Sequence, residues 1–128
     1  MTKDEFLARV EKAGALASPE EAERRSRVVL SALTHLITAP APRRHFLSQL
    51  PGFLKSQLLA EAPASQLMNR DAFIRHIGAG LDGHAGEAER ALGAVYGVLT
   101  EAVSPGEISE FERQLPPEIG AFLRKFRA

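Results

Sequence analysis

The sequence has no cysteine among its 128 residues. A disulfide framework, a thiolate metal site and a cysteine nucleophile are therefore excluded, and a cytoplasmic protein is the simplest interpretation. Long apolar runs are also missing: no stretch approaches the roughly 20 residues that a membrane-spanning helix needs, so no membrane association is expected. Residues 1–5 are not followed by an apolar run, which predicts that there is no signal peptide.

The chain also has no net charge. Sixteen Lys and Arg balance sixteen Asp and Glu, so the overall positive field of a dedicated nucleic-acid binder is absent. The balance hides an asymmetry: residues 1–60 hold nine basic and six acidic side chains, and residues 61–128 hold seven and ten. We expect no nucleic-acid partner, and we expect the two halves to carry small charges of opposite sign.

An internal repeat is the strongest pattern that the sequence does contain. Groups of residues in the first half recur in the second half at offsets of 67, 66 and 65, and each change of offset falls in a predicted loop. Loops vary in length more readily than the elements they connect, so a duplicated structural unit is indicated. The matches are residues 4–10 with 71–77; Ala22-Glu23-Arg24 with Ala88-Glu89-Arg90; Val29, Leu33 and Thr34 with Val95, Leu99 and Thr100; and Phe46, Gln49-Leu50-Pro51 with Phe111, Gln114-Leu115-Pro116.

Each copy predicts four helices. Apolar residues recur at helical spacing, and Ser18 followed by Pro19 and Glu21 is typical of a helix start. No stretch shows the alternation of apolar and polar residues that is typical of a β-strand. The expected helices cover about residues 4–14, 19–38, 43–50 and 51–60 in copy one, and 70–80, 85–103, 105–115 and 116–127 in copy two, with a linker over residues 61–69.

The predicted fold is all-α. Two tandem helical repeats of about four helices each are expected to pack with pseudo-two-fold symmetry into one bundle, because one copy alone is too short to bury its apolar stripes. The chain is then a single domain over residues 1–128, with repeat one at 1–60 and repeat two at 70–128. The centre of its core should hold Val29, Leu33, Val95 and Leu99, where the two longest helices meet.

The order of these motifs resembles a known family. An acidic residue and a Phe open each copy, Ser-Pro-Glu-Glu-Ala-Glu-Arg precedes a long helix at residues 18–24, and Gln-Leu-Pro precedes a short one. This pattern is similar to an uncharacterised bacterial family that is known only as a domain of unknown function with two tandem helical repeats. The resemblance covers nearly the whole chain and departs at residues 39–42. It implies an all-helical fold and brings no catalytic residues.

No catalytic, cofactor-binding or metal-binding motif is recognisable. A helical zinc pair needs histidines at i and i+4, and no serine lies in a Gly-x-Ser-x-Gly elbow. The four histidines, His35, His45, His76 and His84, do not have that spacing. We predict no catalytic residue, no cofactor and no bound metal.

Paired carboxylates also give no sign of acid–base chemistry. Glu20-Glu21 and Glu110/Glu112 are expected in surface turns. Burial, which tunes the pKa of a carboxylate for catalysis, is not expected there.

A basic cluster is one candidate site. Arg24, Arg25 and Arg27 open the longest helix of copy one, and Arg43 and Arg44 open the next helix. Contact with phosphate or nucleic acid is one interpretation. Interleaved glutamates and the lack of an aromatic platform favour the other, a solvated face of mixed charge.

Two glycines form a second candidate site. Gly93 and Gly97 lie inside the longest helix of copy two, on the side away from Val95 and Leu99. Each mid-helix glycine costs about 1 kcal/mol relative to alanine, so a close approach of another backbone is one explanation. That backbone belongs either to a second molecule or to other helices of the same chain. The remaining interpretation is a surface on which glycine is merely tolerated.

These patterns leave two main functional hypotheses. The first is a non-enzymatic interaction or regulatory module with an unknown protein partner or with itself, as a homodimer that uses the longest helix of copy two. The alternative is a small-ligand-binding helical bundle with an apolar pocket between the repeats. A pocket lined by Leu, Val and Phe with one or two polar groups favours the alternative, whereas a full core and a smooth exposed patch favour the first. An enzyme ranks third.

Overall fold

Side chains cap the helices where the sequence marks their starts. The hydroxyl of Ser18 accepts a hydrogen bond from the backbone N–H of Glu21 at 3.2 Å. Thr2 and Ser104 accept from the residue three positions on at 3.2 and 3.4 Å, and the Asn69 side chain accepts from Ala72 N–H at 2.8 Å. Each cap satisfies one of the N–H groups that a helix start leaves unpaired.

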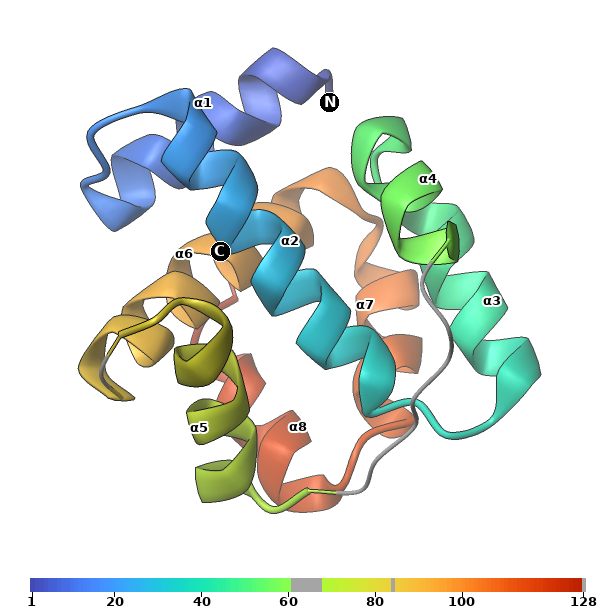
Figure 1. The fold of residues 1–128 in the computed structure, drawn as a ribbon. Coiled ribbons are helices and arrows are strands. Elements are labelled where there is room, and N and C mark those ends of the chain that lie inside the picture. Colours follow the sequence, from blue (N-terminus) through green and yellow to red (C-terminus); the bar gives the residue numbers. More distant parts are fainter. Residues whose placement is uncertain (61–67, 84, 128) are drawn as a thin grey trace.

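A computed structural model describes residues 1–60, 68–83 and 85–127, and the part of the chain so described is helical with no strand (Figure 1). This confirms the predicted all-α class. The helices of the first half are α1 (Lys3–Gly14), α2 (Pro19–His35), α3 (Pro40–Gln49) and α4 (Gly52–Ala60). Those of the second half are α5 (Arg70–Gly80), α6 (Ala85–Ala102), α7 (Pro105–Arg113) and α8 (Pro117–Arg124).

Three helix ends differ from the prediction by three residues. Helix α3 begins at Pro40 rather than near residue 43, because prolines are tolerated in a first turn whose N–H groups have no intrahelical partner. Helix α2 ends at His35 and α8 at Arg124, both three residues early. Most of the predicted linker, residues 61–67, lies outside the described residues.

The two longest helices, α2 and α6, pack against each other at the centre of the bundle. Val29, Leu33, Val95 and Leu99 have no exposed surface, which confirms them as core residues. One continuous cluster of buried apolar residues includes side chains from both halves of the chain. In Figure 1, α2 crosses the bundle with α3 and α4 together on one side and α5 on the other.

Matching helices of the two halves contact each other, since α2 packs on α6 and α3 packs on α7. The pseudo-two-fold symmetry of the whole arrangement stays a prediction. Within the described residues, no helix has both the length and the apolar composition needed to cross a membrane.

Candidate functional site

Two aromatic rings bring the third helices of the two halves together. Phe46 of α3 and Phe111 of α7 stack with ring centroids 4.3 Å apart and planes inclined by 17°. Both rings are almost fully buried. Phe46 and Phe111 occupy matched positions of the two copies. Contact between matched residues is what a two-fold arrangement produces near its axis.

A groove of about 380 Å³ lies beside this stack, between α3 and α7. Its volume falls within the range of small-molecule sites. Polar side chains are confined to a minority of the lining. The apolar part is formed by Ile37, Ala41, Pro42, Phe46, Val103, Ile108 and Phe111.

One polar contact in the groove joins the two helices, α3 and α7, that form its walls. Nε2 of His45 on α3 lies 2.6 Å from Oε2 of Glu107 on α7. On α7, Glu110 is paired with Arg113, and Gln114 donates a hydrogen bond to Oε1 of Glu110 at 3.1 Å. The bond from Arg113 holds the pKa of the Glu110 carboxyl below its usual value, so this carboxylate is ionised at neutral pH.

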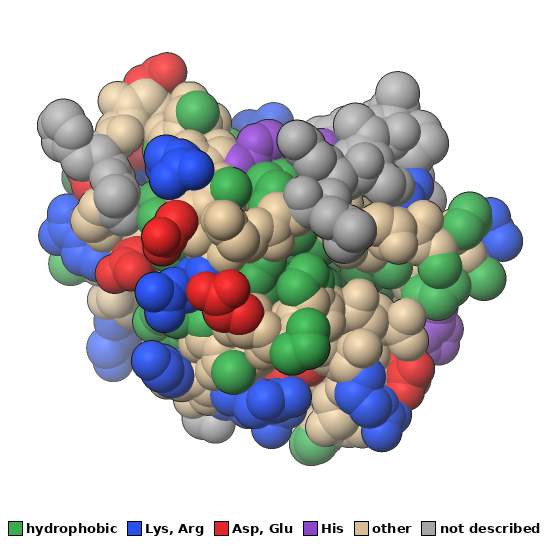
Figure 2. Space-filling model, turned by 90° about the horizontal axis from the view of Figure 1, so that it is seen from below, with side chains coloured by type: hydrophobic (Ala, Val, Ile, Leu, Met, Phe, Trp, Pro, Cys, Tyr) green, Lys and Arg blue, Asp and Glu red, His purple; other side chains and the backbone are tan. Residues whose placement is uncertain are grey.

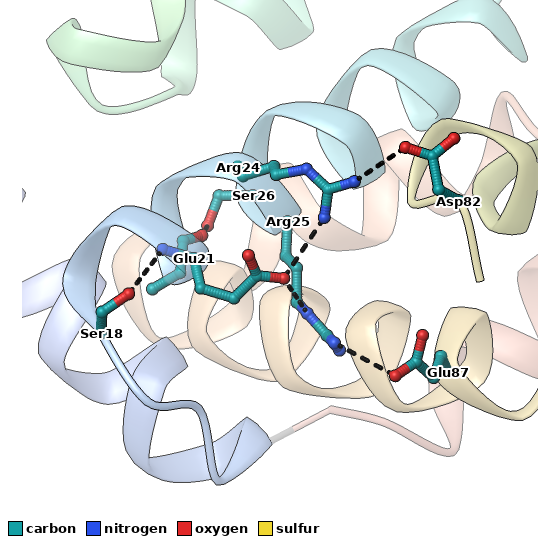
Figure 3. A network of polar contacts seen from close by, with 8 residues as sticks. Ser18, Glu21, Arg24, Arg25, Ser26, Asp82 and Glu87 are labelled. Atoms are coloured by element: carbon teal, nitrogen blue, oxygen red, sulfur yellow. Dashed lines mark hydrogen bonds and ion pairs between the residues drawn. The ribbon is translucent and has the colours of Figure 1, made fainter.

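The basic cluster predicted from sequence is largely engaged in contacts within the chain (Figure 3). Arg24 lies 3.3 Å from Oε1 of Glu21 and 3.5 Å from Oδ2 of Asp82. Arg25 lies 3.0 Å from the same Glu21 oxygen and 3.7 Å from Oε1 of Glu87. These arginines tie α2 to the second half of the chain.

Arg43 has a different structural role. Its Nε and Nη2 donate to the carbonyls of Ile37 and Thr38, at 2.9 and 3.3 Å, just beyond the end of α2. Arg27 and Arg44 are exposed, and a phosphate contact at either stays a prediction. Figure 2 shows basic and acidic side chains lying next to one another on the face in view, not a continuous basic surface.

The glycine stripe is covered in part by the chain itself. A Cβ at Gly93 would lie 3.0 Å from Cδ1 of Phe126, and a Cβ at Gly97 would lie 3.1 Å from the Phe126 carbonyl oxygen. The close approach that these glycines permit is therefore made by Phe126, through its ring at Gly93 and its backbone carbonyl at Gly97. Self-association through this face stays a prediction.

The expectation that Glu112 lies in an exposed turn is wrong. Its side chain is 1% exposed within α7, on the same face as Ile108, Phe111 and Leu115. The Tyr96 hydroxyl donates to Glu112 Oε2 at 2.6 Å, and Nε of Arg127 donates to the same oxygen at 3.1 Å. Nε of Arg124 lies 3.4 Å from Oε1. The helical spacing of Glu112 from Ile108 was the signal that sequence reasoning missed.

This contact set changes the titration of its members. Burial, reinforced by the hydrogen bond to Glu112, raises the pKa of Tyr96 far above its ordinary value. The hydrogen bond to Glu112 also raises the pKa of Arg127. Both shifts favour the neutral phenol and the charged guanidinium that the geometry shows.

Histidines from two helices come together without forming a metal centre. The rings of His35 on α2 and His76 on α5 have centroids 6.1 Å apart, and His84 lies outside the described residues. In the part of the chain that the structure describes, no group of three or more His, Asp or Glu side chains is placed to hold a metal ion.

Comparison with protein families gives a match over most of the chain. The model of a family described as an uncharacterized conserved protein (DUF2267) matches residues 3–122, nearly the whole chain. No curated protein matches the sequence.

Proposed function

Because the chain belongs to the family of uncharacterised conserved proteins DUF2267, whose description names no activity, we propose a function from the geometry: a non-enzymatic helical module that binds a small, largely apolar ligand between α3 and α7. The observation that carries this proposal is the groove of about 380 Å³ lined by Ile, Val and Phe side chains from both halves of the chain. A pocket between the repeats is what separates the ligand-binding hypothesis from an interaction module. This groove differs from the expected one in having, among its described lining residues, no leucine and five polar side chains instead of one or two: His45, Gln49, Glu107, Glu110 and Gln114.

The exposed surface supports a small ligand over a protein partner. A stable protein interface covers roughly 800 Å² on each partner and has an apolar centre. Among the side chains whose exposure the structure describes, Met1 is the one large hydrophobic side chain that is exposed. The glycine stripe, which was the main argument for self-association, is covered in part by Phe126. A cytoplasmic location is part of the proposal and is supported by the absence of cysteine.

The test is binding of N-phenylnaphthylamine, an uncharged apolar fluorophore, to the wild type and to two tryptophan variants. Ala41 is exposed and lines the groove, so Ala41→Trp places a large side chain there. Ala121 is exposed on α8 and serves as the matched control. We expect saturable binding of one probe per chain, weakened at least tenfold by Ala41→Trp and unchanged by Ala121→Trp.

Circular dichroism checks that each variant is folded. Absence of saturable binding to the folded wild type overturns the proposal, as does binding that Ala41→Trp leaves unchanged. Light scattering tests whether a second copy of the chain fills the groove instead of a small ligand. A wild-type dimer that Ala41→Trp converts to a monomer would show this and would also overturn the proposal.

A further inference from the structure

The charged side chains of the groove are acidic. Glu107 and Glu110 line it, with side chains 33% and 46% exposed, and no Lys or Arg stands among its described lining residues. Two neighbouring side chains moderate these carboxylates. His45 pairs with Glu107 across the groove, and Arg113, outside the lining, pairs with Glu110. The negative charge is thus placed beside an apolar cavity and reachable from solvent.

Acceptor oxygens accompany these carboxylates. Gln49 and Gln114 line the groove from matched positions of the two copies. The amide nitrogen of Gln49 donates to Ser48 Oγ at 3.3 Å and that of Gln114 donates to Glu110 at 3.1 Å. In the contacts that the structure describes, the two amide oxygens take no part, and they are placed to accept. Among the contacts of the described residues, the Glu107 carboxylate uses Oε2, which leaves Oε1 to accept as well.

An ammonium group matches this arrangement, because it carries a positive charge and has hydrogen-bond donors without an acceptor. We propose that the groove selects amphiphiles with an apolar tail and a cationic amine head, with the tail against Phe46 and Phe111 and the head at Glu107 and Glu110. This inference rests on the proposed function and adds the chemical class of the ligand.

An anionic head is disfavoured at the same place. One pair of unit charges about 4 Å apart in water changes a binding constant roughly fivefold. Attraction of an amine and repulsion of a carboxylate act in opposite directions, and salt and the pairing with His45 and Arg113 reduce both effects. We expect a preference of about tenfold for the amine over the carboxylate at low ionic strength.

The experiment is displacement of N-phenylnaphthylamine by octylamine, octanol and octanoate, which share a tail length and differ in head charge. Near neutral pH and low salt, octylamine should displace the probe at about one-tenth of the octanoate concentration, with octanol between them. Added salt should shrink this ratio, because the groups involved are partly exposed.

Variants that remove the two carboxylates test whether Glu107 and Glu110 cause the preference for an amine. In the double variant Glu107→Gln, Glu110→Gln, the ratio of octylamine to octanoate affinity should fall to near one. Glu118→Gln is the matched control, since Glu118 is an exposed carboxylate on α8, away from the groove. It should keep the wild-type ratio.

The outcomes separate the two proposals. If the probe does not bind the wild type, the proposed function fails before charge is considered. If the probe binds and is displaced, but octylamine and octanoate act equally, the amine preference is wrong and the proposed function stands. A wild-type ratio in the double variant would also overturn the assignment to Glu107 and Glu110.

Discussion

At the scale of single residues, the contact between Tyr96 and Glu112 is the feature with the clearest chemical consequence. The phenol has no exposed surface and donates to a carboxylate that is itself buried. Ionising Tyr96 would place a second negative charge beside the first in a poorly solvated site, which burial and like charge both oppose. The folded protein therefore holds Tyr96 in its neutral form.

This arrangement predicts a loss of stability at alkaline pH. The pKa of Tyr96 is raised by folding above its ordinary value of 10.0, so its contribution is fully present below pH 10 and falls as the pH rises beyond it. Unfolding in urea at a series of pH values should show this loss, and Tyr96→Phe should show a smaller one.

The absorbance of tyrosinate provides an independent check, because Tyr96 is the only tyrosine in the chain. Its appearance should coincide with the loss of helical circular dichroism. Tyrosinate that forms while the helical signal is intact would contradict the buried contact with Glu112.

At the scale of helices, the crossing of α5 and α2 depends on the absence of a side chain. A Cβ at Gly80, the last residue of α5, would lie 2.8 Å from Cγ1 of Val28 on α2. Real contacts are essentially never this short, and the branched Val28 side chain is stiff. Glycine here allows the two helices to approach.

We expect Gly80→Ala to lower the free energy of unfolding by about 1–3 kcal/mol through overpacking. Val28→Ala in the same background should restore part of the loss by removing the clash. The measurement is urea unfolding followed by circular dichroism.

Gly86→Ala is the matched control, because a Cβ at Gly86 meets nothing within 4 Å and the position lies near the start of α6. It should be neutral or stabilise the protein by up to about 1 kcal/mol. Equal effects of the two substitutions would show that α2 and α5 do not approach as closely as the structure indicates.

At the scale of the whole molecule, the two halves share one apolar core. Leu33 of α2 is fully buried where α2 meets α6, and the cluster that contains it includes residues from both halves. Neither half encloses this cluster by itself. We therefore expect the two halves to unfold together.

Leu33→Ala should lower the free energy of unfolding by about 2–5 kcal/mol through the cavity it leaves, a large part of a typical total of about 5–15 kcal/mol. Urea unfolding should be followed both by circular dichroism, which reports all helices, and by fluorescence of Tyr96, which reports the second half. Coincident transitions are expected in the wild type and in the variant. Separate transitions, or an unchanged midpoint in Leu33→Ala, would contradict a shared core.

The sequence by itself determined the helices, most of their boundaries and the centre of the core. Caps such as Ser18 act within one turn, and the apolar stripe that holds Val29 and Leu33 follows from the period of a single helix. Caps and apolar periodicity depend on residues within one helix, so they can be recognised in the sequence without knowing which helices pack together. Even the error at Pro40 was local, because a proline-rich first turn was taken for the end of a loop.

Only the tertiary structure decided what each face contacts. The spacing of Glu112 from Ile108 places it on the buried face of α7, but its partners come from elsewhere: α6 and the segment after α8 bring Tyr96 and Arg127 to it. Gly93 is partly covered because Phe126 packs against α6 there. The groove exists because α3 and α7, far apart in the sequence, pack through Phe46 and Phe111. Each of these outcomes depends on a partner from a distant part of the chain, and local periodicity does not identify that partner.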